Sequence, residues 1–435
     1  MNMSNMSFSK MAQLSKNILG LAAAIAGLGG AAAWADSAAS VDGRWDASVT
    51  VNGAVIPFRL DISGDGATLK GTLYNGDDPE YTTQASFQNG TLVLNQEHYL
   101  TKITADLKDG ELNGKVQMRN DQSSEGSAFQ AKRHVDAGPP AADAPSIAGR
   151  WIIPYESPKG EKAWRFIVKQ SGPDVTAAIL RVDGDTGALT GTFRDGKWLL
   201  SHFDGQRPYL LEVTPAADGS LALVQKGGGP RQGSLTAFRE DVAQAKALPA
   251  PSDYTTHTTM KDPNEVFAYS FPDVNGKVLS NNDPKFKGKV VLAIVTGTWC
   301  PNCHDEAQYL VQLYKKYRAQ GLEIVALDFE EPEQQDDLAR VHAFIKQYGV
   351  EYTYLIAGAP AEMWEKVPQA VNLNTWPATF FVGRDGKVKH IHAGFAAPAS
   401  GEFNAQLKQE FTATIEKLLA EKSGSLVSAN AGPRP

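Results

Sequence analysis

The stretch KVVLAIVTGTWCPNCHDEAQYLVQLYKKYRAQG, residues 289–321, contains the only two cysteines of this 435-residue chain. Its first part, residues 289–297, is a continuous apolar run, which is typical of a β-strand buried on both faces. From Cys303 onward the apolar residues recur at helical spacing, and Gly321 is well placed to end the helix. The cysteines are therefore predicted to lie where a buried strand gives way to a helix.

Cys300 and Cys303 form a C-x-x-C pair, which can bind a metal, staple a loop or carry out redox chemistry. A structural zinc site usually needs four ligands, and the sequence has no second cysteine pair and no flanking group of cysteines and histidines. A disulfide that closes so short a loop restricts the unfolded chain little, so it stabilises weakly. The pair is therefore predicted to be redox-active, and we expect neither a metal nor a cofactor.

A thiol at the start of a helix is favoured in disulfide exchange. The helix N-terminus carries a partial positive charge and free N–H groups that stabilise a thiolate, and the thiolate is the form that attacks a disulfide. Cys300 is therefore the predicted nucleophile, and Cys303, one turn into the helix, is predicted to resolve the mixed disulfide. Pro301 suits the first helical turn because its missing N–H costs no hydrogen bond there.

Composition and the N-terminus predict where the protein acts. Charged residues make up 21% of the chain and the formal net charge is −7, so we expect no nucleic acid partner. Lys10 and Lys16 precede an uncharged run that ends in the triplet Ala-Trp-Ala at 33–35. This pattern predicts a cleaved secretory signal peptide over residues 1–35 and a periplasmic location, with an uncleaved membrane anchor as the alternative.

Two segments upstream of the cysteines resemble each other. Both begin Gly-Arg-Trp, with Trp45 and Trp151 lying 106 residues apart. In each copy apolar and polar residues alternate, and turn signals recur about every 8–12 residues, as in the antiparallel sheets of small barrels or sandwiches. The sequence therefore predicts two all-β modules, at residues 41–135 and 147–241, whose cores the two tryptophans plug at one end.

The rest of the chain predicts a different fold class. Residues 255–422 alternate buried strands with amphipathic helices, one of them at 334–349, and end in two strands around an Asp-Gly turn and a final helix. This order predicts an α/β domain with a thioredoxin-like sheet. The expected architecture is multidomain, with two all-β modules, this α/β domain and a disordered tail at 423–435.

Three blocks of the last domain resemble the TlpA/ResA-like thiol-disulfide oxidoreductases of the thioredoxin superfamily: FKGKVVLAIVTGTWCPNCHDEAQYL, GLEIVALDFE and WPATFFVGRDGKV. The resemblance covers residues 263–422 and leaves the β modules outside. Members of the family are usually kept reduced by a membrane thiol donor, and they reduce disulfides in exported clients, including apocytochromes c. The resemblance therefore implies a disulfide reductase that acts on exported proteins.

The resemblance also implies roles for further residues. Pro377 matches the cis-proline that packs against the dithiol, and Trp376 before it would present backbone groups to an extended substrate. Trp299 matches the tryptophan that shields one side of the nucleophile. Glu306 matches a glutamate that would carry the proton of the resolving thiol; the alternative is a solvated glutamate that complements the helix dipole. The family commonly has a proline where this chain has Gln308.

Four titratable residues near these blocks have no assigned role. Asp305 is expected to be solvated and to complement the helix dipole. His304 follows the second cysteine and could lower a thiol pKa when protonated, but a residue there is more often exposed, and we expect an exposed histidine. His390 and His392 share one strand face in an H-x-H pattern. That pattern suits metal ligands, but no third ligand is evident, so we expect polar residues of an edge strand.

Two other functions stay open. The segment DPNEVFAYSF looks like the opening of a peroxiredoxin, a thiol peroxidase, whose site carries Pro-x-x-x-Thr-x-x-Cys. The positions before Cys300 are Ala293 and Gly297, so that pattern fails there, and the positions before Cys303 fail too. The second alternative is an envelope binding protein in which the β modules carry the main role.

Overall fold

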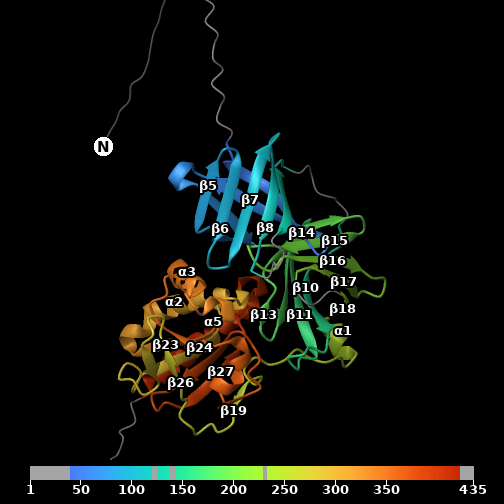
Figure 1. Cartoon of the computed structure of the whole chain (residues 1–435). Helices are drawn as coiled ribbons and strands as arrows, with labels where there is room; N and C mark the ends of the chain where they lie inside the picture. The colour runs from blue at the N-terminus through green and yellow to red at the C-terminus, as the bar shows by residue number, and fades with distance from the viewer. Residues whose placement is uncertain (1–39, 120–124, 137–143, 229–232, 422–435) are drawn as a thin grey trace, which may run out of the picture. The chain divides into compact units, whose positions relative to one another are not determined.

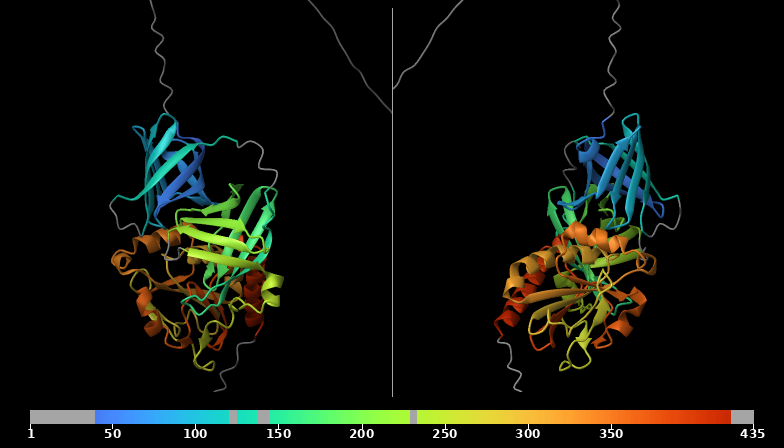
Figure 2. Two further views of the ribbon diagram at one scale, coloured as in Figure 1. Left: turned by 90° about the vertical axis from the view of Figure 1, so that its right-hand side faces the viewer. Right: turned by 60° about the vertical axis from the view of Figure 1, so that its left-hand side comes forward.

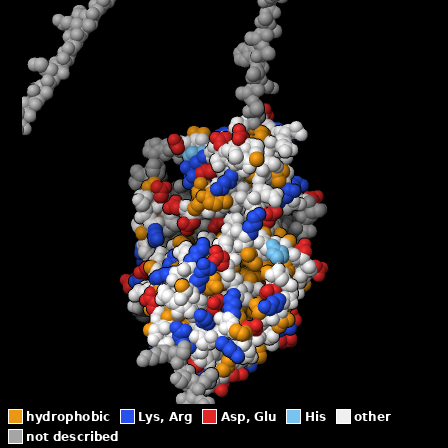
Figure 3. Space-filling model, turned by 90° about the vertical axis from the view of Figure 1, so that its left-hand side faces the viewer, with side chains coloured by type: hydrophobic (Ala, Val, Ile, Leu, Met, Phe, Trp, Pro, Cys, Tyr) orange, Lys and Arg blue, Asp and Glu red, His pale blue; other side chains and the backbone are white. Residues whose placement is uncertain are grey.

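The computed structural model describes residues 40–119, 125–136, 144–228 and 233–421. The predicted signal peptide at 1–35 and the predicted tail at 423–435 lie outside these ranges. Within the described ranges, no helix is long and apolar enough to cross a membrane. On the face drawn in Figure 3, basic and acidic side chains are interspersed over the surface.

The first module is an open half-barrel of antiparallel strands, drawn in blue and cyan in Figures 1 and 2. The strand order is β4-β3-β2-β1-β9-β8-β7-β6-β5. Strands β4 and β5 are the two edges of this sheet, and among the described residues no ladder pairs them, so the sheet stays open. Along β2 the side chains of Ile56, Leu60 and Ile62 are buried in the core, as the alternating pattern predicts. The strands are β1 (Gly43–Val51), β2 (Ala54–Ser63), β3 (Lys70–Asn75), β4 (Asp78–Tyr81), β5 (Gln84–Gln88), β6 (Thr91–Gln96), β7 (Thr101–Lys108), β8 (Glu111–Gln117) and β9 (Ser127–Arg133).

The second module is a closed barrel. Its strands follow the order β11-β10-β18-β17-β16-β15-β14-β12-β13, and an additional pairing of β11 with β12 closes the sheet on itself. The strands are β10 (Gly149–Pro154), β11 (Ala163–Ser171), β12 (Asp174–Arg181), β13 (Gly184–Asp185), β14 (Leu189–Arg194), β15 (Lys197–His202), β16 (Tyr209–Pro215), β17 (Leu221–Gly227) and β18 (Gly233–Arg239), and helix α1 (Glu240–Ala245) follows them.

The sequence repeat is also a structural repeat. Trp45 and Trp151 are both buried, and each indole N–H donates to the carbonyl oxygen four residues before it, at 2.9 and 3.0 Å. A guanidinium lies 4.1 Å from each ring centroid, that of Arg133 in the first module and that of Arg239 in the second. The prediction that these tryptophans plug the module cores is therefore confirmed.

The C-terminal part of the chain forms a mixed sheet in the order β24-β23-β22-β26-β27. Strand β22 is parallel to β23 and antiparallel to β26. Side chains of β22 point alternately to the two faces of the sheet, and each face has its own hydrophobic core. Helices α2, α3 and α5 cover one face, and helix α4 with the segment around Phe267 covers the other. Burial on both faces explains the continuous apolar run, and the sheet is thioredoxin-like, as predicted.

The main elements of this part are β22 (Val290–Thr296), α2 (Pro301–Tyr317), β23 (Leu322–Phe329), α3 (Ala339–Tyr348), β24 (Thr353–Gly358), α4 (Met363–Lys366), β26 (Ala378–Val382), β27 (Val388–Ala393) and α5 (Glu402–Ala420). Shorter strands are β19 (Thr259–Met260), β20 (Ser270–Pro272), β21 (Val278–Ser280) and β25 (Ala370–Val371). Single 3₁₀ turns lie at Gly66–Thr68, Arg318–Gln320, Pro332–Gln334, Pro360–Glu362 and Pro398–Ser400.

Helix α3 begins later than the sequence predicts. The expected start is residue 334, whereas α3 starts at Ala339. Leu338 just before it has a left-handed backbone with φ +52°, and the carboxylate of Asp337 accepts the N–H of Ala339 at 3.0 Å. A left-handed residue interrupts helical hydrogen bonding, so the polar residues before it do not extend the helix.

Candidate active site

The two thiols lie at the junction of β22 and α2. Cys300 is the residue directly before the helix, and Cys303 lies one turn inside it. Both are buried, with 4% and 1% of their surface exposed. Burial, followed by the hydrogen bond with Cys300, raises the pKa of the Cys303 thiol well above its usual range. Cys303 therefore needs a base before it can attack, and Cys300 is the more accessible thiol.

The predicted substrate-facing residues gather around Cys300. Its thiol donates to the carbonyl oxygen of Trp376 at 3.4 Å, and the Trp376–Pro377 peptide is cis. The rings of Trp299 and Trp376 meet edge to face, with centroids 5.1 Å apart. The indole N–H of Trp299 donates to the carbonyl of Phe329 at 2.8 Å, which fixes the ring beside the dithiol. The structure therefore brings Trp299, Trp376 and Pro377 together with the thiols.

Glu306 is buried on the first turns of α2, with 1% of its surface exposed. The hydroxyl of Thr379 on β26 donates to its carboxylate at 2.5 Å. Burial raises the pKa of Glu306 to about 8, against the opposing effect of that hydrogen bond. The alternative of a solvated glutamate does not agree with this burial, and a carboxyl group with a pKa near neutrality is suited to moving protons.

The predictions for His304 and Asp305 are wrong. His304 is fully buried; one ring nitrogen lies 2.7 Å from the carbonyl of Thr298 and the other 2.9 Å from the hydroxyl of Tyr348. Burial also lowers its pKa well below the usual range. The carboxylate of Asp305 lies 3.3 Å from the guanidinium of Arg207, and burial raises its pKa to about 6 against that attraction. Neither residue is solvated.

The burial of this turn comes from the β modules, which sequence reasoning treated as independent of the dithiol. Tyr99 of the first module lies 4.5 Å from the His304 ring, centroid to centroid. In the second module, the carbonyl of Asp183 accepts the side-chain amide of Asn302 at 2.7 Å, and Arg207 donates to the amide oxygen at 3.2 Å. Asn302 is one of the two residues between the cysteines, so a β module holds the dithiol loop directly.

The first module reaches the residue before the nucleophile. The guanidinium of Arg119 donates to the carbonyl of Trp299 at 2.8 Å and lies 5.7 Å from the centre of its ring. It also pairs with Glu331 at 3.5 Å. Sequence reasoning missed Arg119, Asp183 and Arg207, because nothing in a β-strand repeat indicates which turn will meet a distant domain.

A cavity of about 710 Å³ adjoins the dithiol loop. Trp299 and Pro301 form part of its wall, and both β modules supply the rest. The wall includes three arginines and four aromatic side chains: Tyr99, Arg119, Trp164, Arg181, Arg207, Tyr209 and Trp299. The space next to Cys300 is therefore shaped by all three parts of the chain.

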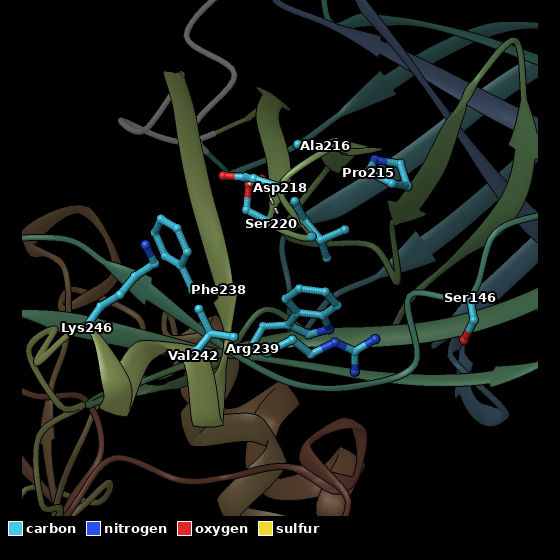
Figure 4. Close-up of a pocket in the computed structure, with 12 residues that line it drawn as sticks. Ser146, Pro215, Ala216, Asp218, Ser220, Phe238, Arg239, Val242 and Lys246 are labelled. Atoms are coloured by element: carbon cyan, nitrogen blue, oxygen red, sulfur yellow. Dashed lines mark hydrogen bonds between the residues drawn. The ribbon is translucent and has the colours of Figure 1, made fainter.

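A smaller cavity of about 420 Å³ lies in the second module (Figure 4), and neither cysteine is among the residues that line it. It is lined by residues of that module and of α1, among them Trp151, Asp218, Arg239 and Lys246. The carboxylate of Asp218 accepts hydrogen bonds from the N–H and the hydroxyl of Ser220, so it is already satisfied.

A buried ion pair supports the end of β22. Arg340 on α3 is fully buried and pairs with Glu330, which is buried as well. Its Nε donates to the hydroxyl of Thr298 at 2.9 Å, and its Nη1 donates to Glu331 at 3.0 Å. The pair therefore fixes the backbone that leads into the dithiol loop.

A thioredoxin-like sheet with a strand-to-helix C-x-x-C pair opposite a cis-proline defines the class of thioredoxin-like redox proteins. Residues 264–391 match the family model described as AhpC/TSA family. Over 135 residues the chain is 33% identical to thiol-disulfide oxidoreductase ResA of Bacillus thuringiensis subsp. konkukian (strain 97-27), covering 31% of this chain and 71% of that relative. The chain therefore belongs to the ResA family of thiol-disulfide oxidoreductases.

Further relatives are similar over the same region only. ResA of Bacillus anthracis is 35% identical over 116 residues, which cover 27% of this chain and 60% of that relative. The chain thus spans about three fifths of the length of this relative. A solved thiol:disulfide interchange protein from Chlorobium tepidum TLS is 21% identical, with a TM-score of 0.28, covering 37% of this chain and 99% of that one.

Proposed function

We propose that this protein is an exported thiol-disulfide oxidoreductase that reduces disulfides of periplasmic protein clients through its WCPNC dithiol. The observation that carries the proposal is the position of Cys300, at the start of α2 and against the carbonyl of Trp376. An extended client segment that pairs with the backbone of Trp376 would present its disulfide to this thiol. The periplasmic location rests on the signal-like N-terminus and on the family.

In the proposed reaction, the thiolate of Cys300 attacks one sulfur of the client disulfide. One client sulfur leaves as a thiolate and takes a proton, and the other stays bound to Cys300 as a mixed disulfide. Glu306 as a carboxylate accepts the proton of Cys303, whose thiolate then attacks the sulfur of Cys300. The client leaves with two thiols, and the protein keeps a Cys300–Cys303 disulfide, so two electrons have passed to the client.

The oxidised dithiol must then be reduced again. A membrane thiol donor of the kind used by the family would supply two electrons by the same exchange in reverse, with Glu306 returning its proton to Cys303. Apocytochrome-like proteins are the client class that the family implies. Neither partner is needed to test the central claim, because a model protein disulfide can replace the client.

The test is the reduction potential of the dithiol, measured in the full-length protein against a glutathione or dithiothreitol buffer. We expect a value near that of thioredoxin, about −270 mV, since a reductase must be the stronger reductant. A value near −120 mV would mean that the protein oxidises its clients, and the direction proposed here would be wrong. Failure to exchange with any dithiol buffer would overturn the oxidoreductase function altogether.

A second candidate is a binding protein whose β modules capture a ligand, which the cavity of about 710 Å³ next to the modules favours. The double variant Cys300→Ser, Cys303→Ser separates the two functions. This variant should lose all of the protein's function in the cell if the dithiol is essential. It should keep that function if the main role is the binding of a ligand by the β modules.

A further inference from the structure

A cluster of side chains that could bind a metal ion lies at the β27 edge of the C-terminal sheet and does not include the two cysteines. Strand β27 is the outer strand of the sheet and carries His390 and His392, and α5 carries Glu410. Nε2 of His390 lies 2.6 Å from Oε1 of Glu410, and Nδ1 of His392 lies 2.9 Å from the same oxygen. The three ligand atoms all lie within 4.8 Å of one another.

The sequence indicates the two histidines but not the third residue. Glu410 follows His392 by 18 residues and comes from a helix that packs against the strand, so no local pattern connects them. The absence of a third ligand was the reason to expect ordinary polar residues on an edge strand. The structure supplies that ligand, and it also shows His392 to be buried rather than exposed.

The spacing fits a transition-metal ion. Zinc binds imidazole nitrogens at about 2.0–2.1 Å and carboxylate oxygens at about 2.0–2.2 Å, so the ligand atoms of a tetrahedral site lie about 3.4 Å apart. To admit an ion, the distance from Glu410 to His390 would need to open by about 0.8 Å and the distance from Glu410 to His392 by about 0.5 Å. Two imidazoles and one carboxylate are a ligand set that zinc uses where a fourth position is left for water.

The surroundings hold the ligands in place and leave one side open. The His392 ring stacks on Tyr254, with centroids 5.6 Å apart, and meets Phe411 edge to face at 5.3 Å. The side chains of His390 and Glu410 are 25% and 30% exposed, so an ion can enter from solvent.

We propose that His390, His392 and Glu410 form a binding site for a divalent transition-metal ion such as zinc, with water in the remaining position. An ion bound there would fasten the edge strand β27 to helix α5. Its presence would also hold the neighbouring strand: His392 pairs with Thr379 in the sheet, and Thr379 is the residue that donates to Glu306. The site does not depend on the redox function proposed above.

Zinc titration by calorimetry tests this proposal in the full-length protein. The Cys300→Ser, Cys303→Ser variant is the parent, because reduced thiols would bind zinc themselves. We expect one zinc per chain in this parent. His390→Ala and Glu410→Gln should each weaken zinc binding by more than about 100-fold, since even residues behind the ligands cost about 10–100-fold. His342→Ala, at an exposed histidine of the same domain, should bind like the parent.

Thermal unfolding with and without zinc gives a second readout. Zinc should raise the Tm of the parent and of the His342→Ala control, and should leave that of Glu410→Gln unchanged, because an ion that binds only the folded chain stabilises it. Equal zinc affinity in all variants would show adventitious binding elsewhere. No binding by the parent would leave only a hydrogen-bonded His–Glu–His cluster. Either result overturns the proposal.

A second inference rests on the proposed redox function and concerns Arg119 of the first module. Its guanidinium binds the carbonyl of Trp299, directly before the nucleophile. The same guanidinium pairs with Glu331 at 3.5 Å, which anchors it at this point. We infer that Arg119 is a positioning residue that fixes the Trp299–Cys300 backbone in place for disulfide exchange.

The rate of disulfide exchange at Cys300 tests this inference directly. It is measured with a model disulfide in a Cys303→Ser background, where Cys300 is the only thiol. In Arg119→Met we expect the rate constant to fall about tenfold or more, because a small displacement of a reacting group can cost about 100-fold in rate. Arg119→Lys should recover part of the loss, and Arg44→Met, at an exposed arginine of the same module, should have no effect.

An unchanged exchange rate in Arg119→Met would overturn the role of Arg119, whatever the reduction potential turns out to be. The two proposals can therefore be refuted separately. A wrong potential refutes the proposed direction of electron flow, and an unchanged rate refutes only the contribution of the module.

Discussion

Replacing Glu306 by glutamine should remove a pH dependence of stability that the native chain carries. In the folded protein the pKa of this buried carboxyl group is raised from 4.5 to about 8. Between these two values the folded chain keeps the proton while the unfolded chain releases it. The free energy of unfolding therefore falls as the pH rises, starting near the unfolded pKa and ending above the folded one.

The size of the effect follows from the shift. Each pKa unit corresponds to about 1.4 kcal/mol, so Glu306 destabilises the chain by about 3 kcal/mol at pH 7 and by almost 5 kcal/mol above pH 8. Glutamine has a similar shape and stays neutral at every pH. The stability difference between Glu306→Gln and the wild type should therefore grow by about 4 kcal/mol from pH 5 to pH 8.5.

The assay is urea unfolding of both reduced full-length proteins at pH 5 and pH 8.5. Comparing variant with wild type at each pH cancels the titrations of the other groups, which the two chains share. Glu365→Gln, at an exposed glutamate of the same domain, is the matched control and should change the stability little at either pH. A stability difference that is the same at both values would show that Glu306 titrates normally, and the role as proton carrier would then lose its basis.

Three further predictions concern other parts of the structure. Arg340→Met leaves Glu330 buried without its partner and should cost about 3–5 kcal/mol in urea unfolding; a loss below about 1 kcal/mol would mean that water reaches the pair. Trp45→Ala and Trp151→Ala remove equivalent core residues and should each lower stability by about 3–5 kcal/mol, measured by calorimetry; clearly unequal losses would contradict the structural equivalence of the modules. Cys303→Ser should accumulate a mixed disulfide with a protein substrate on non-reducing gels, and rapid turnover by this variant would exclude its role as resolving thiol.

The elements nearest the dithiol could be predicted because their signals are local. A run of apolar residues with no polar alternation requires burial on both faces, and β22 has it. The helix that follows is specified by the spacing of its apolar side chains and by Pro301. The two tryptophans could be placed by repetition, since the same three residues open both modules.

Contacts between parts that are distant along the chain could not be predicted from the sequence. His304 was expected to be exposed because nothing on its own helix covers it; Tyr99 and Tyr348 do so from other elements. Glu410 was not seen as a partner of the two histidines for the same reason. Nor could alternation distinguish an open half-barrel from a closed barrel, because the difference lies in one strand pairing, that of β11 with β12.

The hydrogen bonds to Asn302 make the reduction potential of the dithiol depend on residues outside the C-terminal domain. The two residues between the cysteines of a C-x-x-C site set its potential, and here one of them is held by Asp183 and Arg207 of the second module. Transplanting the C-terminal domain alone would carry over the WCPNC letters but not these partners. The reduction potential is then a property of the whole chain. Exchanging the second module for that of a relative would change this potential without any substitution in the C-x-x-C motif.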